Sequence, residues 1–402
     1  MKTGWRIGSL FGIPLLLDTS WFSILALVTF LYGGVVWQSE NWGPVVPWLA
    51  GFAMALLLFG SVLLHELGHS LVARSQGITV NSITLFLFGG IASIDQESKT
   101  PGQAFQVAIA GPAVSFILFL VLWPLSSVLA FSAPSAAIIR ELAHINLVLA
   151  IFNMIPGLPL DGGQVLKAAV WKVTGSRLKG VRWAARIGQA LGWTAIILGI
   201  TAFITSTSLG FLWIVLLGWF GVRNATAYTR VTDLQEALLQ LNAASAMTHD
   251  YRVVDAELTV SQFTDKYLLQ EEGLTPVFYA ASDGRYRGMI AVDELSNMER
   301  SEWDRKTLKT LVDPLTDIPS VVESTPLTRV IETLENEQLR RITVLSPAGA
   351  VAGVIDRGDI VRSVAEKLKI PVPEALIKRI KEEGAYPPGL QLQALAKSVS
   401  DL

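Results

Sequence analysis

Long runs of apolar residues alternate with short polar connections over the first 228 residues of the chain. Runs close to the ~20 residues that a bilayer requires lie at 17–37, 46–73, 103–131, 136–155, 185–205 and 208–226. This pattern predicts six transmembrane helices. Beyond Thr229, charged residues are interspersed as in a soluble protein. The main domain boundary is therefore expected at residue 228.

The basic residues of this region gather in every second connection. Lys2 and Arg6 precede the first run, Arg74 and Lys99 lie between the second and third, and five more lie between the fourth and fifth. The alternate connections, around 38–45, 132–135 and 206–207, contain no Lys or Arg. Because short basic loops stay on the cytoplasmic side, we expect a multi-pass protein of a prokaryotic-type cell membrane with both termini in the cytoplasm. Only Arg140 departs from this bias.

Two stretches of this region differ from plain loops and helices. Ile78–Asp95, "ITVNSITLFLFGGIASID", is rich in β-branched and aromatic residues and is broken at Gly89-Gly90. It predicts a short strand pair beside the membrane, with an edge that another strand could join. In the third run, Gly111-Pro112 marks a kink or a close-packing point, and helix bending is the favoured interpretation.

The composition narrows the chemistry of any functional site. Hydrophobic residues make up 51% of the 402 residues and charged residues 16%, with a formal charge of -2 and no basic cluster. A nucleic-acid partner is therefore not expected, because phosphate binding needs a concentrated positive field. The chain contains no cysteine. Disulfides and thiolate metal ligands are excluded, so a metal ion would be held by His, Asp or Glu.

The motif "HELGH" lies near the end of the second apolar run. His65 and His69 are one helical turn apart, so they lie on one face of a helix and can bind the same ion. Glu66, beside the first histidine, is placed to act as a water-activating base. The alternative interpretation is a pair of buried histidines with only a structural role. We disfavour it because ionisable groups within a membrane span are costly and usually functional.

A catalytic zinc ion needs a third protein ligand and an open position for water. His144 is expected toward the outer half of the fourth run, and His249 lies in the soluble part. The stretch "FNMIPGLPLDGGQ" is a better candidate, because its prolines and glycines break the fourth helix and leave Asp161 at a depth similar to that of the histidines. Irregular backbone at such depth is tolerated where it lines a wet cavity. Asp161 is therefore the predicted third ligand, and the bland alternative is a helix-stopping turn.

The combination of "HELGH" with "NMIPGLPLDGG" resembles the site-2 protease family of intramembrane zinc metalloproteases, which are peptidase M50-like. The resemblance extends to the branch of this family with C-terminal CBS domains. It implies one Zn²⁺ bound by His65, His69 and Asp161, with Glu66 as the general base. The implied activity is cleavage of single-pass transmembrane proteins, which is regulated intramembrane proteolysis.

The same resemblance assigns further positions less directly. Asn153 matches an Asn that helps to hold substrate or stabilise the oxyanion. "FLFGGIAS" matches the element where substrate is unwound into an extended strand, which implies substrate binding by Phe88, Gly89 and Gly90. Ser115 stands where relatives often have Asn, and we expect this difference to affect packing.

The soluble part contains an internal repeat. Leu274–Leu295 aligns with Leu339–Ile360, 65 residues later, and each copy has a strand, a Gly turn, a strand and a helix start. The repeat resembles a tandem CBS pair. The expected divisions are a membrane domain at 1–228, a linker helix at 229–243, a CBS pair at 244–368 with repeats at 244–300 and 308–368, and a tail at 369–402.

The resemblance implies nucleotide binding at the CBS pair, with Asp359 on the ribose of ATP or AMP. The second copy has Asp356 where Ser or Thr is usual, and the first has Ala291 and Glu294 in the corresponding motif. An acidic group at the hydroxyl position would repel phosphate. Two roles therefore stay open, namely adenine-nucleotide sensing and a structural role that includes homodimerisation.

The predicted fold is a polytopic α-helical membrane protein with a membrane-associated β-hairpin, followed by a C-terminal α/β tandem CBS domain. A second class of function is a CBS-regulated transporter or ion channel that uses the same intramembrane polar residues, since such residues also mark ion pathways. Spacing favours the protease, because hydrolysis needs a Glu beside a ligand pair at i and i+4 and transport does not.

Overall fold

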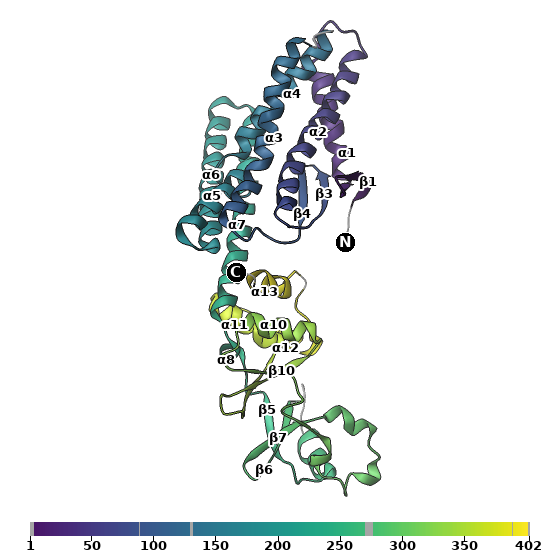
Figure 1. Cartoon of the computed structure of the whole chain (residues 1–402), viewed down its shortest axis with the longest axis vertical. Coiled ribbons are helices and arrows are strands. Elements are labelled where there is room, and N and C mark those ends of the chain that lie inside the picture. The colour runs from purple at the N-terminus through teal and green to yellow at the C-terminus, as the bar shows by residue number, and fades with distance from the viewer. Residues whose placement is uncertain (1–3, 88, 129–131, 270–275, 388, 401–402) are drawn as a thin grey trace. The chain divides into compact units, whose positions relative to one another are not determined.

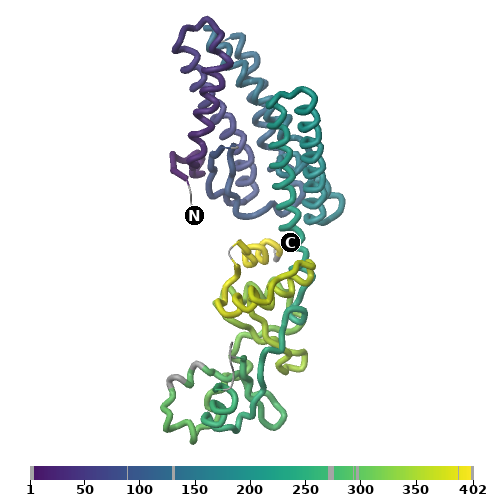
Figure 2. Tube along the Cα trace, turned by 180° about the vertical axis from the view of Figure 1, so that it is seen from behind, coloured from purple at the N-terminus to yellow at the C-terminus, as the bar shows by residue number. Residues whose placement is uncertain are grey.

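The structure is a computed structural model that describes residues 4–87, 89–128, 132–269, 276–387 and 389–400. The chain divides into two units, one of long apolar helices with a four-stranded sheet and one of short helices and two smaller sheets, with the boundary between Thr232 and Asp233 (Figures 1 and 2). This boundary falls inside helix α7, Leu212–Gln240. The predicted linker segment is thus helical up to Gln240 and continuous with the last apolar helix.

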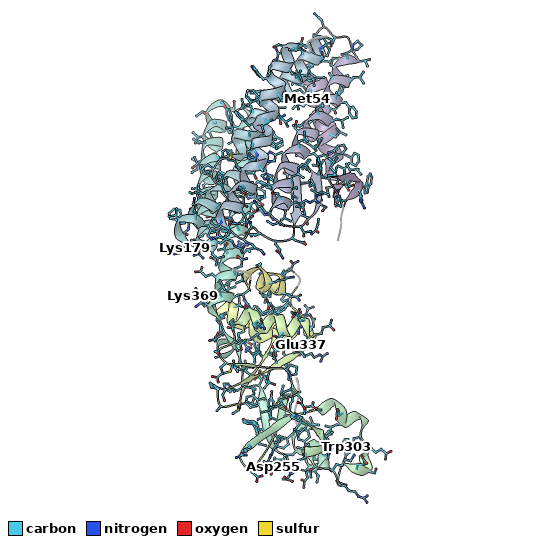
Figure 3. The ribbon with its side chains drawn as sticks, in the orientation of Figure 1. Met54, Lys179, Asp255, Trp303, Glu337 and Lys369 are labelled. Carbon is cyan, nitrogen blue, oxygen red and sulfur yellow. The ribbon has the colours of Figure 1, made fainter. Side chains whose placement is uncertain are left out.

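The first unit is a bundle of long apolar helices. They are α1 (Ser20–Phe30) with its π-helical continuation η1 (Leu31–Val36), α2 (Val46–Ser75), α3 (Pro101–Val128), α4 (Ala133–Asn153), α5 (Asp161–Thr174), α6 (Arg177–Ser206), the 3-10 turn η2 (Leu209–Phe211) and α7. Their packing leaves many large apolar side chains exposed, as expected of a lipid-facing surface. Met54 of α2, labelled in Figure 3, is fully buried with Trp37, Ala50 and Leu142.

The predicted number of membrane-crossing helices was wrong by one. Within the described residues, five helices are long and apolar enough to cross a membrane, namely Val46–Ser75, Pro101–Val128, Ala133–Asn153, Arg177–Ser206 and Leu209–Gln240. The first predicted span is the shorter apolar helix Ser20–Val36. At ~1.5 Å per residue, its length is about 25 Å, below the ~30 Å of a hydrocarbon core.

A four-stranded sheet packs against the end of α2 that carries the histidines. Its strands are β1 (Trp5–Leu10), β2 (Ile13–Leu17), β3 (Val80–Phe86) and β4 (Gly89–Ile94), in the order β1-β2-β3-β4. Ile13, Leu15 and Ile83 pack in one cluster with Leu67 and Ala73 of α2. The predicted strand pair is confirmed as β3 and β4, and β4 is an edge strand. The pairing of β3 with an N-terminal hairpin was not predicted.

The break between α4 and α5 is held against α6 by close backbone contacts. The Leu158 amide donates to the Ala184 carbonyl over 3.2 Å. A Cβ on Gly157 would lie 2.7 Å from Cα of Gly188, so the two glycines permit this approach. The break therefore ends in a fixed position, and α5 begins at Asp161.

The second unit contains two small sheets, with strand orders β5-β6-β7-β8 and β11-β10-β9. Its strands are β5 (Tyr251–Asp255), β6 (Val277–Ser282), β7 (Arg285–Ile290), β8 (Val312–Pro314), β9 (Ser320–Val322), β10 (Arg341–Leu345) and β11 (Val351–Asp356). The antiparallel pairs β6/β7 and β10/β11 fall in the two aligned copies of the sequence repeat.

The helices of this unit differ between the two halves. They are α8 (Ala243–Ala246), α9 (Val260–Phe263), α10 (Leu327–Asn336), α11 (Arg357–Lys367), α12 (Glu374–Glu383) and α13 (Leu392–Ser400), with short turns η3 (Thr264–Leu268), η4 (Val292–Asn297), η5 (Arg300–Glu302) and η6 (Leu308–Leu311). After β11 the chain forms the full helix α11, whereas after β7 it forms only the 3-10 turn η4.

The C-terminal tail forms part of the core of the second unit. The predicted amphipathic helix is α12, and α13 follows it. Ile377, Ile380, Leu392 and Ala396 of the tail are buried in the same cluster as Ile342 of β10. The tail therefore contributes to the packing of the second half and is not a loose extension.

Candidate metal centre

Three metal-ligand side chains converge where α2 meets the start of α5. His65 and His69 are 4% and 8% exposed. Their Nε2 atoms are 3.3 Å apart, and Asp161 Oδ2 is 3.1 Å from the first and 3.4 Å from the second. Among the described residues, they form the group of His and acidic side chains that is close enough to hold a metal ion. The predicted third ligand thus lies beside the predicted pair.

The dimensions of this triangle fit zinc. In a tetrahedral site with metal-to-donor distances of about 2.0–2.1 Å, neighbouring donor atoms are about 3.3 Å apart. The three separations of 3.1, 3.3 and 3.4 Å match one face of such a tetrahedron. Three protein ligands leave the fourth position open, which is the arrangement of a catalytic rather than a structural zinc site.

The second nitrogen of each imidazole is also engaged. Nδ1 of His69 lies 2.7 Å from the Val107 carbonyl, and Nδ1 of His65 lies 2.9 Å from Ser115 Oγ. A carbonyl only accepts hydrogen bonds, so Nδ1 of His69 donates and Nε2 of the neutral ring keeps its lone pair. Lone pairs and a carboxylate oxygen that face one another at this distance repel unless a cation or a proton lies between them. The donor set therefore fits a cation, and helix α3 orients both rings from behind.

Gly111 of α3 supplies the space that the imidazoles occupy. A Cβ at this position would lie 2.2 Å from His69 Nε2 and 2.6 Å from His65 Nε2. The sequence pattern favoured helix bending at Gly111-Pro112, whereas the structure gives this glycine a contact role. Its role was missed because the contact joins residues about 40 positions apart in the chain.

Ser115 was expected to affect packing, but it is fully buried and its hydroxyl lies within hydrogen-bonding distance of His65. We expect Ser115→Ala to weaken zinc binding by about 10–100-fold, the usual effect of losing a group that orients a metal ligand. Competition with a chromogenic chelator would measure this affinity. Ser126→Ala is the matched control, because Ser126 is a residue of the same helix whose hydroxyl donates to the Trp123 carbonyl over 2.6 Å. Equal affinity of the two variants would contradict the role of Ser115.

Glu66 lies against the edge strand. A Cβ on Gly90 would be 2.5 Å from Cγ of Glu66, so β4 approaches this side chain closely only because residue 90 is glycine. Gly89, with φ +130°, has a backbone conformation that favours glycine, and its nearest neighbour at the Cβ position is Val62 of α2. Phe88, the third predicted substrate-binding residue, lies outside the described residues. The two glycines thus lie at the face of α2 that carries Glu66.

Other predicted positions are not hydrogen-bonded to the metal ligands within the described residues. Asn153 is the last residue of α4, and in the part of the chain that the structure describes it makes no hydrogen bond to His65, Glu66, His69 or Asp161. Its role stays a prediction. His144 of α4 is exposed and His249 belongs to the second unit, so neither joins the metal-ligand group.

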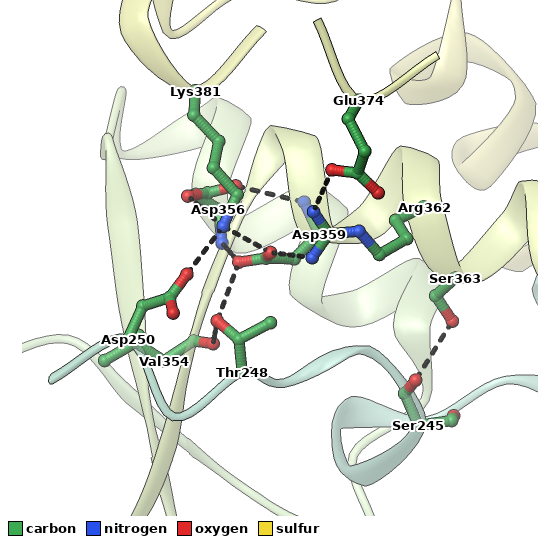
Figure 4. A network of polar contacts seen from close by, with 10 residues as sticks. All are labelled: Ser245, Thr248, Asp250, Val354, Asp356, Asp359, Arg362, Ser363, Glu374 and Lys381. Carbon is green, nitrogen blue, oxygen red and sulfur yellow. Dashed lines mark hydrogen bonds and ion pairs between the residues drawn. The ribbon is translucent and has the colours of Figure 1, made fainter. Parts of the chain in front are cut away.

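Asp359, the predicted ribose ligand, is 2% exposed and engaged by neighbouring side chains (Figure 4). Lys381 Nζ of α12 lies 2.6 Å from Asp359 Oδ1 and 3.5 Å from Asp356 Oδ2. Thr248 Oγ1 donates to Asp359 Oδ2 over 3.3 Å. Burial and the Asp356 carboxylate raise the pKa of Asp359 to about 6, against the influence of Lys381. Nucleotide binding here stays a prediction.

Comparison with known proteins gives a consistent result for both units. The model of peptidase family M50 matches residues 53–137 and 128–195, and the CBS domain model matches residues 309–366. The second match lies within the second unit.

Named relatives cover most of the chain. "Putative zinc metalloprotease sll0528" of Synechocystis sp. is 40% identical over 362 residues, which are 90% of this chain and 96% of that protein. "Zinc metalloprotease MJ0392" of Methanocaldococcus jannaschii is 28% identical over 90% of this chain and 96% of that protein. Among solved structures, the site-2 protease from Methanocaldococcus jannaschii is 30% identical, with 56% of this chain and 95% of that chain covered and a TM-score of 0.42.

The identity to the Synechocystis protein over nearly its full length, together with the two model matches, confirms the resemblance found in the sequence. The chain belongs to peptidase family M50, as a membrane zinc metalloprotease of the site-2 protease type with a C-terminal CBS domain.

Proposed function

We propose that the protein is an intramembrane endopeptidase that cleaves the transmembrane segments of single-pass membrane proteins. The observation that carries this proposal is the triangle of His65, His69 and Asp161 beside Glu66, at the buried end of an apolar helix bundle. The alternative of ion transport has no comparable support, since the relatives that cover most of the chain are named as metalloproteases.

The residues of the site divide the chemistry between them. His65, His69 and Asp161 would hold Zn²⁺, which when bound polarises the scissile carbonyl and acidifies a water molecule. Glu66 takes a proton from the attacking water and delivers it to the leaving amine. Ser115 and the Val107 carbonyl keep the imidazoles oriented throughout. Asn153 is proposed to help hold the substrate or stabilise the oxyanion.

The substrate must be extended before it can be cut, because a helical peptide bond is shielded by its own turns. Lipid offers no replacement for the hydrogen bonds that are lost on unwinding. Pairing of the unwound segment with the free edge of β4 would supply them. The glycines at positions 89 and 90 support this proposal, since they bring that edge close to Glu66. Substrates with helix-breaking residues near the cut should therefore be preferred.

The orientation proposed from the basic residues places both termini and the CBS region in the cytoplasm. Arg74 lies in the last turn of α2, nine residues after His65. At ~1.5 Å per residue, the first zinc ligand is then on the order of 14 Å from that end of the helix. Water can reach such a depth through a polar cavity open to the cytoplasm.

The second unit is proposed to contain two CBS repeats, with the first at about residues 244–300. The equivalent strand pairs β6/β7 and β10/β11 support this division. Of the two roles left open by the sequence, the burial of Asp359 under Lys381 favours the structural one, which includes homodimerisation. An adenine nucleotide would have to displace this ammonium group to reach the carboxylate.

Removal of the metal tests the proposed activity. Incubation of the purified protein with a strong chelator should stop cleavage of a single-pass membrane substrate, and addition of Zn²⁺ should restore it. His69→Ala should lose both zinc and cleavage. His144→Ala, which removes an exposed histidine outside the cluster, should retain both. Cleavage that continues in metal-free protein would refute the proposal.

A further inference from the structure

The carboxylate of Glu97 lies within ion-pair distance of two nearly buried cations at one end of the bundle. The side chains of Lys167 in α5 and Arg177 in α6 are each 10% exposed. Glu97 Oε2 lies 2.6 Å from Lys167 Nζ and 3.5 Å from Arg177 Nη1. A buried cation is costly unless it is paired. Pairing with Glu97 therefore offsets the cost of burying Lys167 of α5 and Arg177 of α6.

The charge state of Glu97 agrees with this pairing. Partial desolvation raises the pKa of the Glu97 carboxyl, whose side chain is 56% exposed, but the Lys167 ammonium and the Arg177 guanidinium outweigh it, so the pKa lies below the usual value of a glutamate. The carboxyl is therefore ionised at neutral pH. The interaction is a charge-assisted hydrogen bond, which is stronger and shorter than a neutral one.

Glu97 follows the edge strand β4, with which an extended substrate is proposed to pair. It lies three residues after Ile94, where β4 ends, in the segment that leads to α3 (Figure 1). Of the polar contacts described for residues 95–100, those of Asp95 return to β3, through the Thr79 carbonyl and the Asn81 amide. Those of Glu97 reach α5 and α6 instead. Glu97 thus ties the segment after the edge strand to a different part of the bundle.

The partner helix α5 carries the third metal ligand. Asp161 is its first residue and Lys167 lies six residues further on. Three contacts therefore connect β4, α2 and α5 to one another. Gly90 of β4 approaches Glu66 of α2, and His65 of α2 lies beside Asp161 of α5. Lys167 of α5 pairs with Glu97, in the segment that follows β4. A shift of β4 relative to α5 would stretch the ion pair.

We propose that Glu97 is a positioning residue whose ion pair with Lys167 holds the edge strand β4 in place relative to the metal-binding end of α5. A substrate strand paired with β4 is then held beside Glu66, which Gly90 approaches. Glu97 does not contact the metal ligands, so it sets how well the extended substrate is bound and not how fast a correctly bound peptide is cut. This inference rests on the proposed function and deepens it.

Kinetics of Glu97→Gln test the inference. With a transmembrane substrate in detergent micelles, KM should rise roughly tenfold, within the range by which residues remote from a ligand alter its binding. The zinc content and the kcat at saturating substrate should stay close to those of the unmodified protein. Glu40→Gln is the matched control, because it makes the same chemical change at an exposed position before α2. An unchanged KM in Glu97→Gln would overturn the proposal.

A charge swap separates positioning from a general loss of stability. The double variant Glu97→Lys with Lys167→Glu restores an ion pair with reversed charges, and its KM should return toward the original value. A double variant that folds and holds zinc but keeps the raised KM would also overturn the proposal. If Glu97→Gln does not fold, the double variant is compared directly with the unmodified protein by the same criterion.

Comparison of Glu66→Gln with Glu97→Gln shows whether the positioning role or the proposed hydrolytic activity has failed. If Glu66→Gln is inactive and Glu97→Gln is normal, only the positioning role fails. If Glu66→Gln cleaves normally, the proposed hydrolytic mechanism fails, whatever the result for Glu97.

Discussion

Glu66→Gln is expected to lower cleavage of a single-pass membrane substrate by about 10²–10⁴-fold, the range that general acid-base groups contribute. The amide of Gln cannot take a proton from water or deliver one to the leaving amine. It has nearly the same shape as the carboxylic acid, so the contact with Gly90 and the packing of α2 should survive. Glu66 is not among the three metal ligands, so the zinc content should not change.

Metal analysis and cleavage have to be measured on the same preparation. Zinc retained together with lost cleavage identifies Glu66 as part of the chemistry. Glu40→Gln, at an exposed position outside the site, should cleave normally. A Glu66→Gln protein that holds zinc and still cleaves at the original rate would exclude Glu66 as the general base.

Gly111→Ala is expected to abolish both zinc binding and cleavage, although it adds only one methyl group. The new Cβ would lie 2.2 Å from His69 Nε2 and 2.6 Å from His65 Nε2. Both distances are far below van der Waals contact, and the Nδ1 atoms of both histidines are hydrogen-bonded to residues of α3. At least one imidazole has to leave its position, which breaks the ligand triangle.

Helix propensity alone predicts that Gly111→Ala stabilises helix α3. Alanine is more favourable than glycine inside a helix by about 0.8–1.0 kcal/mol, so a loss of zinc could not be attributed to a weaker helix. Gly102→Ala is the matched control, since it lies on the same helix with no atom within 4 Å of the added Cβ. Equal zinc content in the two variants would show that the imidazoles can move aside.

The group of candidate metal ligands could be predicted from the sequence because part of it depends on local spacing. His65, Glu66 and His69 lie within five residues, and a helix necessarily places the two histidines on one face. Asp161 was found by its depth in the membrane and by the broken backbone around it. The first argument needs only the helical period, and the second needs only the depth of each residue along its predicted span.

The contacts that position the two histidines could not be predicted from the sequence, because they join distant segments of the chain. Ser115 and Gly111 act on His65 and His69 across about 40–50 positions of sequence, and a pattern of apolar residues does not reveal such pairs. The hairpin of β1 and β2 was missed for a different reason. Its short apolar run, Ile13–Leu17, has no period that distinguishes a strand from the start of a helix.

The packing of the tail has a consequence for the order of events during synthesis. Helix α13 packs on α10, and its Leu392 and Ala396 fill the core that Ile342 shares. That core cannot close before the α13 segment has left the ribosome. A chain that stops after Lys369 would leave this apolar surface open, and such unfinished domains are removed by cellular proteases. The segment after Lys369 therefore decides whether the second unit closes its core and escapes degradation.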